Sequence, residues 1–270
     1  EQEPIHKWTR YHRGKKMVKV EIANVRVTLN KLAKRKSYNK LTPREQAYID
    51  ALRILYGGGT LAERTVGYAR AMEKLYRNYP DDLEAAAFYA LSLLGHRWST
   101  EEGTARQERA GAVATEVYRR NPAHPGAAHY ILHSFDEPLL AERALDAARH
   151  YAEIAPDVPH ALHMPSHIFL QRGMWPEVIA SNEAAWTTSE DWVRRKQLPP
   201  TYRDYHNLHW LIYGCLQEGR YERATELIER FRAMRGDVTP GAVHYLNDAL
   251  ATFLVETRRW DRAEELLDPG

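Results

Sequence analysis

Several common features are missing from this chain of 270 residues, and each absence excludes a class of protein. Its single cysteine, Cys215, excludes an internal disulfide and a zinc site built from thiolates. No run of about 18 apolar residues is present, so no segment is expected to cross a membrane. The motifs GxxxxGKS/T, GxGxxG, GxSxG and HExxH are absent, which excludes their nucleotide-binding and hydrolase classes. Cys215 itself lies in an apolar helical run and is predicted to be buried.

Strand-forming sequence is also scarce. The patch from Val18 to Val27 is the one ambiguous segment, and we predict that it forms the first turns of a helix running to about Lys36. Elsewhere helical runs alternate with turn residues. Thr42, Pro43 and Glu45, for example, provide an N-cap, a first-turn proline and an acidic residue at the start of a helix. The sequence therefore predicts an all-α chain.

Charge is unevenly distributed although the net charge is only +2. Residues 1–40 hold twelve Lys and Arg against three acidic residues. We predict a basic N-terminal segment and helix here, either separate or part of a truncated first repeat. No nucleic-acid-binding module is recognisable, so nucleic acid is not an expected partner. The chain has neither an initiator Met nor a signal peptide, and we expect a soluble protein that is cytoplasmic or exported with its signal removed.

Histidine, in contrast, is abundant, and its spacing is regular. His129 and His133 recur 34 residues later as His163 and His167. A period of 34 is the length of a tetratricopeptide repeat (TPR), a helix-turn-helix unit. The spacing resumes after an insertion, and alignment on Gly173 and Gly219 gives three columns. These columns are His129, His163 and His209; His133, His167 and Tyr213; and Gly126, His160 and His206.

The remaining sequence fits a TPR-like helix-turn-helix solenoid over residues 41–270, wound as a right-handed superhelix of about six units. Small residues recur in the second helices, as TPR packing requires. The positions that fit are Ala110, Ala114, Ala144, Ala148, Ala224 and Ala263. An insertion at about 187–204 interrupts the period. We predict that residues 187–203 form a lid over the histidines, with an extended second helix or a surface excursion as the alternative.

The histidine columns predict a metal site. Residues three or four apart share one face of a helix, and imidazole is a good ligand for zinc, copper, iron and nickel. We expect the first helices of successive units to bring five ligands together in a concave groove: His129, His133, His163, His167 and His209. His160 and His206 are expected to flank them. Zinc is the expected metal, with copper and iron as alternatives, since no thiolate or carboxylate set selects between them.

Other residues are predicted to support this site. The carboxylates expected to orient the imidazoles are Asp136, Glu137 and Asp204. The tyrosines expected to orient ligands or touch a substrate are Tyr130, Tyr205 and Tyr213. Pro165 lies between His163 and His167 and should interrupt their helix, unless the helix begins there. The histidines outside the columns, His124 and His150 among them, are expected on the surface.

Two functions are compatible with this pattern, and the sequence does not decide whether the protein is an enzyme. A histidine-bound metal with an open coordination position activates water or oxygen toward a small molecule. Alternatively, the groove is a non-catalytic scaffold that binds a peptide or protein, as TPR arrays do. A single histidine in a TPR helix is usually a packed, hydrogen-bonded residue, so the columns carry the first interpretation.

Three segments of the chain resemble a large bacterial family of TPR-repeat proteins: HPGAAHYILHSFDEP, APDVPHALHMPSHIFLQRGMW and YHNLHWLIYGCLQEGRY. That family carries a His-Met-Pro-Ser-His-Ile/Val core, which here runs from His163 to Ile168. The resemblance covers about Leu41 to Glu222. It implies the TPR fold and leaves the activity open.

Overall fold

The structure is a computed structural model that describes residues 25–35, 38–94, 100–234, 236 and 239–267. The regular elements of these residues are helices, which confirms the predicted all-α class. The chain divides into two compact units, Glu1–Val117 and Tyr118–Gly270. Most of the basic N-terminal segment, including most of the patch from Val18 to Val27, lies outside the described residues.

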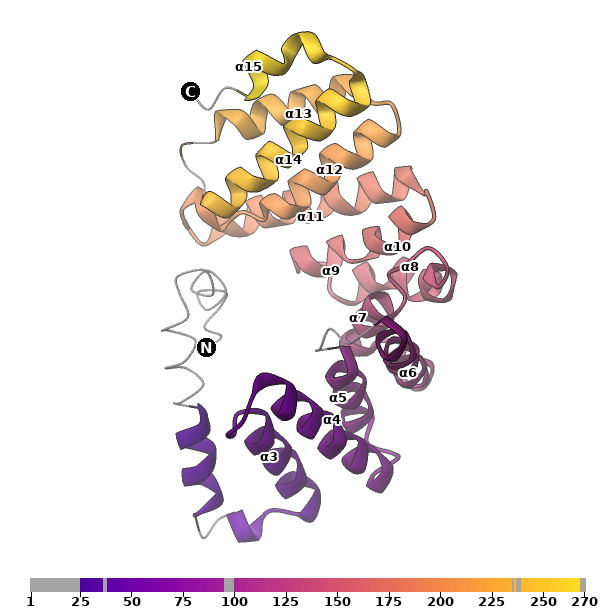
Figure 1. The fold of residues 1–270 in the computed structure, drawn as a ribbon, viewed down its shortest axis with the longest axis vertical. Coiled ribbons are helices and arrows are strands. Elements are labelled where there is room, and N and C mark those ends of the chain that lie inside the picture. The colour runs from indigo at the N-terminus through magenta and orange to yellow at the C-terminus, as the bar shows by residue number, and fades with distance from the viewer. Residues whose placement is uncertain (1–24, 36–37, 95–99, 235, 237–238, 268–270) are drawn as a thin grey trace. The chain divides into compact units, whose positions relative to one another are not determined.

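The first unit consists of helix hairpins (Figure 1). After a helix over residues 25–33 come η2 (Tyr38–Lys40), α3 (Pro43–Leu55), α4 (Leu61–Asn78), α5 (Leu83–Leu94) and α6 (Thr100–Arg120). Thr42 and Thr60 each form a capping box with the glutamate three residues later, which satisfies otherwise free N–H groups at the start of α3 and α4. The predicted helix start at Thr42 is thereby confirmed.

The second unit continues the alternation and carries every column histidine. Its elements are α7 (Pro125–Ser134), η3 (Ala141–Ala144), α8 (Leu145–Ile154), α9 (Pro159–His163), α10 (Pro165–Gln171), α11 (Trp175–Arg195), η4 (Pro200–Tyr202), α12 (Tyr205–Gln217), α13 (Tyr221–Ala233), α14 (Pro240–Thr257), η6 (Trp260–Arg262) and α15 (Ala263–Leu267). Helix α11 packs against α9, α10 and α12, and α12 packs against α13 and α14. With α3/α4 and α5/α6, the described chain forms six successive hairpins, as predicted.

Small residues and tight turns let these helices approach closely. Gly173 and Gly219 have φ of +66° and +77°, a left-handed conformation in which glycine is favoured, and each ends the first helix of a hairpin. Ala110, Ala114 and Ala224 are fully buried, as their positions in the repeat predict. The turn and small-residue pattern read from the sequence is therefore confirmed.

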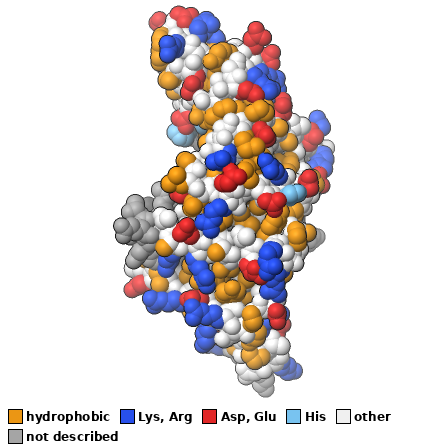
Figure 2. All heavy atoms as spheres, turned by 90° about the vertical axis from the view of Figure 1, so that its right-hand side faces the viewer, with side chains coloured by type: hydrophobic (Ala, Val, Ile, Leu, Met, Phe, Trp, Pro, Cys, Tyr) orange, Lys and Arg blue, Asp and Glu red, His pale blue; other side chains and the backbone are white. Residues whose placement is uncertain are grey.

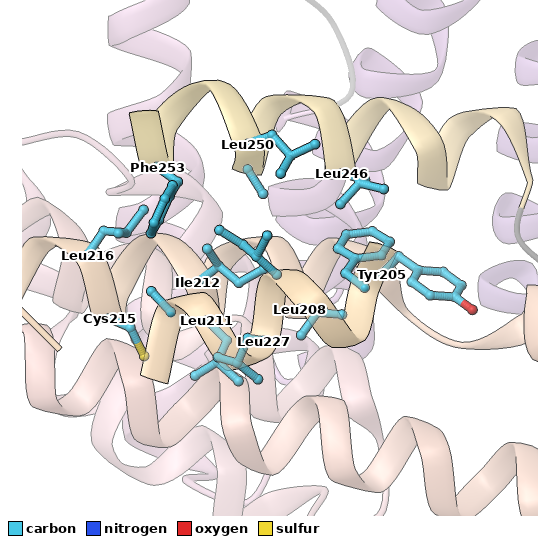
Figure 3. Packing of buried hydrophobic residues seen from close by; sticks show 14 of the residues in the cluster. Tyr205, Leu208, Leu211, Ile212, Cys215, Leu216, Leu227, Leu246, Leu250 and Phe253 are labelled. Carbon is cyan, nitrogen blue, oxygen red and sulfur yellow. The ribbon is translucent and has the colours of Figure 1, made fainter. Parts of the chain in front are cut away.

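Helix α12 lies at the centre of an apolar cluster of the second unit (Figure 3). Leu208, Leu211 and Ile212 are almost fully buried between α11, α13 and α14. Cys215 is buried in the same cluster, as predicted. Burial raises the pKa of the Cys215 thiol to about 11, so this residue is neither a thiolate ligand nor a nucleophile at neutral pH.

The insertion corrects one prediction. Its first half is not a loop, because α11 continues without interruption to Arg195. Its second half turns back against the end of α13, where Arg203 donates a hydrogen bond to the sulfur of Met234 at 3.0 Å, and Tyr205 donates to the carbonyl of Pro200 at 3.0 Å. The helical run of residues 175–195 absorbs the added residues as extra turns. Residues 187–195 are therefore an extension of α11, the alternative that the sequence left open, rather than part of a lid.

Surface charges of both signs are interspersed on the face that Figure 2 shows. Ion pairs cross between the second helices of neighbouring hairpins, such as Arg223–Glu183 at 2.9 Å and Arg230–Glu190 at 2.6 Å. Exposed pairs of this kind contribute little to stability. In the described part of the chain, none of the helices has the length and apolar character that crossing a membrane requires.

The contact between α12 and α11 leaves no room for a larger side chain at Gly214. A Cβ atom there would lie 3.1 Å from side-chain carbons of Val178 and Ile179. We expect Gly214→Val to lower the free energy of unfolding by about 1–3 kcal/mol through overpacking, measured by urea denaturation. The control Gly241→Val adds the same atoms in the first turn of α14, where only the Thr239 hydroxyl is near, at 3.8 Å. Equal losses in the two variants would contradict this account of the packing.

Candidate metal centre

Six histidines from α7, α9, α10 and α12 lie together in two groups of three. Within each group, one ring nitrogen of every member lies within 4.8 Å of the others. We call His129, His133 and His160 the first histidine group. We call His163, His167 and His206 the second histidine group. Helix α9 contributes to both, and the rings of His160 and His163, one turn apart on it, have centroids 6.4 Å apart.

The two groups are repeat copies of each other. His129 and His133 correspond to His163 and His167 by the period of 34, and His160 corresponds to His206 by distance from the following turn. In each copy the third-column histidine reaches back to the first-column histidine of the preceding helix. His160 contacts His129 in this way, with ring centroids 5.0 Å apart, and His206 contacts His163 at 4.7 Å. One helix-packing geometry, used twice, builds both groups.

Pro165 interrupts the helix within the second group, as predicted. Proline lacks an N–H, so the i to i−4 hydrogen bond to Ala161 cannot form. Helix α9 ends at His163, α10 begins at Pro165, and the N–H of His167 bonds instead to the carbonyl of Met164 at 3.2 Å. The alternative that the helix begins at Pro165 is wrong, because His160 and His163 already lie in α9.

Asn182 of α11 fixes the ring of His163. The Asn182 side-chain N–H donates to the carbonyl of Val178 at 2.8 Å, so its amide oxygen is the atom that faces Nδ1 of His163 at 2.6 Å. That oxygen only accepts, and Nδ1 of His163 must therefore carry the hydrogen. His163 is 1% exposed, and the ring is held with Nε2 unprotonated.

Asp136 fixes His167 in the same way. Its Oδ2 lies 2.8 Å from Nδ1 of His167, and its Oδ1 accepts from the Gln171 side chain at 3.0 Å. Burial raises the pKa of Asp136, but the hydrogen bonds from His167 and Gln171 outweigh it and hold the pKa below its usual value. The carboxylate is therefore ionised and acts as an acceptor, which places a hydrogen of His167 on Nδ1; in the neutral ring the lone pair is then on Nε2.

The two bare nitrogens face each other. Nε2 of His163 lies 3.1 Å from Nε2 of His167. When both rings are neutral and carry their hydrogen on Nδ1, no hydrogen remains to join the two lone pairs. Two nitrogens bound at about 2.05 Å to a tetrahedral zinc ion lie about 3.3 Å apart. The separation and the tautomers together fit two ligands of one ion.

His206 and Trp210 of α12 complete the surroundings of the second group. The ring of Trp210 lies 4.4 Å from that of His167 and 5.1 Å from that of His163, centroid to centroid. Nδ1 of His206 is buried, and among the described residues it has no hydrogen-bond partner. The group therefore offers three imidazoles beside an apolar wall and leaves one position of a four-coordinate ion open.

The first histidine group is more open to solvent. His133 and His160 are exposed and His129 is half-buried. Nε2 of His129 lies 3.1 Å from Nε2 of His160, and the rings of His129 and His133 have centroids 4.6 Å apart. Tyr151 of α8 stacks on His129 with an interplanar angle of 16°, which fixes the plane of that ring.

The environment keeps the imidazoles of His129, His133, His160, His163 and His206 neutral. Burial lowers the pKa of His163 to about 3, and of His206 to about 4. Burial, followed by the neighbouring His133 and His160, lowers the pKa of His129 to about 3. The pKa values of His133 and His160 are also lowered, mainly because neighbouring protein atoms displace water from one side of each ring. Neutral imidazole is the form that binds a metal, so no proton competes at neutral pH.

His209 belongs to neither group, which differs from the predicted arrangement of five ligands. His209 lies about one helical turn after His206, at a position of α12 that faces Tyr245 of α14. Its ring stacks on Tyr245 of α14 at 5.8 Å. Tyr245 lies thirteen residues before Arg258, whose φ of +55° repeats the turns at Gly173 and Gly219. His209 and Tyr245 thus occupy the first and third columns of a third copy, whose second-column member is Tyr213.

Several predicted supporting residues lie elsewhere. Tyr205 is a core residue, because it lies on the buried face of α12. Its ring stacks on that of Phe231, with centroids 5.3 Å apart. Tyr213 packs edge-on against Trp175 at 6.0 Å. Glu137 makes hydrogen bonds through its backbone N–H and carbonyl. Asp204 lies at the start of α12, where burial raises the pKa of its carboxyl.

Two further histidine neighbours complete the comparison with the sequence. Tyr130 lies beside His129 in α7 and their rings stack at 5.9 Å. His124 is not on the surface as expected. It is 8% exposed, and its Nδ1 accepts a hydrogen bond from the N–H of Ala127 as the N-cap of α7. A histidine before Pro125 is the signal for this cap, since proline favours the first helical position.

Sequence analysis also missed four residues of the site, namely Gln171, Asn182, Trp210 and Tyr151. Gln171 and Trp210 each follow a group histidine by four residues, so the helical period carries a signal for them. Asn182 carries a weaker signal, because it is a polar residue at a position that Ala148 and Ala114 fill in the two preceding repeats.

The low pKa values predict acid sensitivity of the protein stripped of metal by a chelator. Below pH 6.5 the unfolded chain protonates His163, whereas the folded chain excludes that proton until about pH 3. Unfolding is therefore favoured as pH falls through this window, by at most about 1.4 kcal/mol per pH unit for His163. Urea denaturation between pH 7.5 and 5 should show a smaller slope in His163→Gln than in wild type. The exposed His150→Ala is the control, and a slope unaltered by His163→Gln would contradict the prediction.

No protein-family profile matches the chain, and no curated protein matches it in sequence. Solved structures do match in fold. A structure titled MamA 41-end from Desulfovibrio magneticus RS-1 is similar with a TM-score of 0.53 and 13% identity, over 69% of this chain and 92% of that one. A MamA RS-1 ArsTM double mutant is similar with a TM-score of 0.54 and 14% identity, over 72% of this chain and 97% of that one. At this identity the likeness concerns the fold, and with the six hairpins it shows a TPR-like helical solenoid.

Proposed function

We propose that this chain is a TPR-type binding module whose second histidine group holds a divalent transition metal. The observation that carries the metal proposal is the pair of facing Nε2 atoms of His163 and His167, 3.1 Å apart. Both rings are oriented by acceptors on Nδ1, as metal-bound histidines almost always are. Zinc and copper suit a set of imidazoles better than magnesium or calcium, which prefer oxygen ligands.

The binding-module part of the proposal is supported by the fold. Solenoids of stacked helix hairpins present an extended face built from several successive helices, and they commonly use it to bind a partner. The likeness of fold to TPR-type solved structures favours this role over catalysis. The open fourth position of the metal would then accept a side chain or terminal group of the bound peptide or protein.

A metal-dependent enzyme acting on a small molecule is the second candidate. Three histidine ligands with an open position are typical of catalytic zinc sites, in which bound water is activated as a nucleophile. The zinc-loaded protein and His167→Ala can be compared on a panel of small ester and phosphoester substrates. Hydrolysis that depends on both zinc and His167 supports the enzyme. Its absence from a protein that retains zinc favours the binding module.

The metal proposal is tested by elemental analysis and zinc affinity of protein purified without a histidine tag. We expect about one tightly bound equivalent that His167→Ala removes. Asp136→Asn should weaken binding by about 10–100-fold, because the neutral amide polarises His167 less. The adjacent Glu137→Gln removes the same charge and should leave the affinity unchanged. Wild-type protein without tight metal, or equal affinities for Asp136→Asn and Glu137→Gln, would reject the proposal.

A further inference from the structure

The repeat symmetry of the two histidine groups has a direct chemical consequence. Each ligand position of the second group has an imidazole at the equivalent position of the first group, one repeat earlier in the chain. The third copy, in contrast, carries Tyr213 and Tyr245 at two of these positions. Packing does not require imidazoles at His133 and His160 of the first copy, since both side chains are exposed.

We propose that the first histidine group binds a second divalent transition metal. The two groups, which share helix α9, would then form a two-metal centre. This inference rests on the proposed function, in which the second group holds the first ion. The ligand class is the same for both ions, because both groups consist of imidazoles alone.

The geometry of the first group supports a site rather than a chance cluster. Nε2 of His129 and Nε2 of His160 are 3.1 Å apart, the same separation as in the second group. His133 adds a nitrogen within 4.8 Å of both. The three ligands come from two helices, α7 and α9, and the stacked ring of Tyr151 limits rotation of His129. This is the arrangement that the second group builds from α9, α10 and α12.

The structure also assigns the order of affinity. Asn182 orients His163, but the equivalent position one repeat earlier is Ala148, whose methyl group cannot accept a hydrogen bond. His163 is buried, whereas two of the three ligands in the first group are exposed. Rings that are free to rotate lose more entropy on binding, and a first bound dication repels a second one nearby. The first group is therefore the weaker site.

Titration of the metal-free, untagged protein with Zn²⁺ tests this assignment, with isothermal calorimetry in the presence of a competing chelator as the measurement. Wild type should bind two equivalents, the second at least about tenfold more weakly than the first, the scale on which outer-shell support acts. His133→Ala and His160→Ala should each lose the weaker equivalent and keep the tight one within about threefold. His150→Ala, an exposed histidine of α8, should behave as wild type. Circular dichroism checks the fold of every variant, and His133 is exposed enough to be replaced safely.

The outcomes separate the two claims. A single equivalent in wild type, or two equivalents that survive both His133→Ala and His160→Ala, overturns the second metal. If His167→Ala leaves the tight equivalent intact, the proposed function of the second group fails, whatever the first group does. Loss of the weak equivalent alone in His133→Ala and of the tight one in His167→Ala supports both ions at their assigned positions.

Discussion

The chemistry of the site depends on two hydrogen bonds made on the side of the imidazoles that faces away from the metal position. Asn182 and Asp136 accept the Nδ1 protons of His163 and His167, so that in the neutral rings the lone pairs of the two Nε2 atoms face each other. In a packed interior such an arrangement is costly unless a cation lies between the lone pairs. The acceptors come from α11 and from the residues just after α7, so the arrangement exists only once two successive hairpins are stacked.

The stacked hairpins supply that precision through repeated small contacts rather than through one special element. Buried alanines and Gly214 bring neighbouring helices close together, and turns at Gly173 and Gly219 return the chain at fixed intervals. Because each hairpin repeats the geometry of the last, a histidine that reaches its neighbour once does so again in the next copy. The same regularity explains why two histidine groups exist and why the third copy, with Tyr213 and Tyr245, closes the series with aromatic packing.

Much of this was predictable from the sequence because a repeat imposes its period on every column. The helices, the hairpin turns, the break at Pro165 and the clustering of histidines all follow from spacing alone. The pairing between columns did not, since it depends on the offset between adjacent helices, which exchanged the expected places of His206 and His209. Hydrogen-bond acceptors from other helices, such as Asn182, carry only a weak local signal. The insertion was misjudged because Trp186 and the residues after it continue a helix as readily as they form a loop.

The most direct test of the central claim is an anomalous-difference map from crystals grown with Zn²⁺, with data collected on both sides of the zinc absorption edge. The account predicts a peak about 2.0–2.1 Å from Nε2 of both His163 and His167, with His206 as the third ligand. Density for a water molecule joining the two nitrogens, with no anomalous signal beside them, would contradict it.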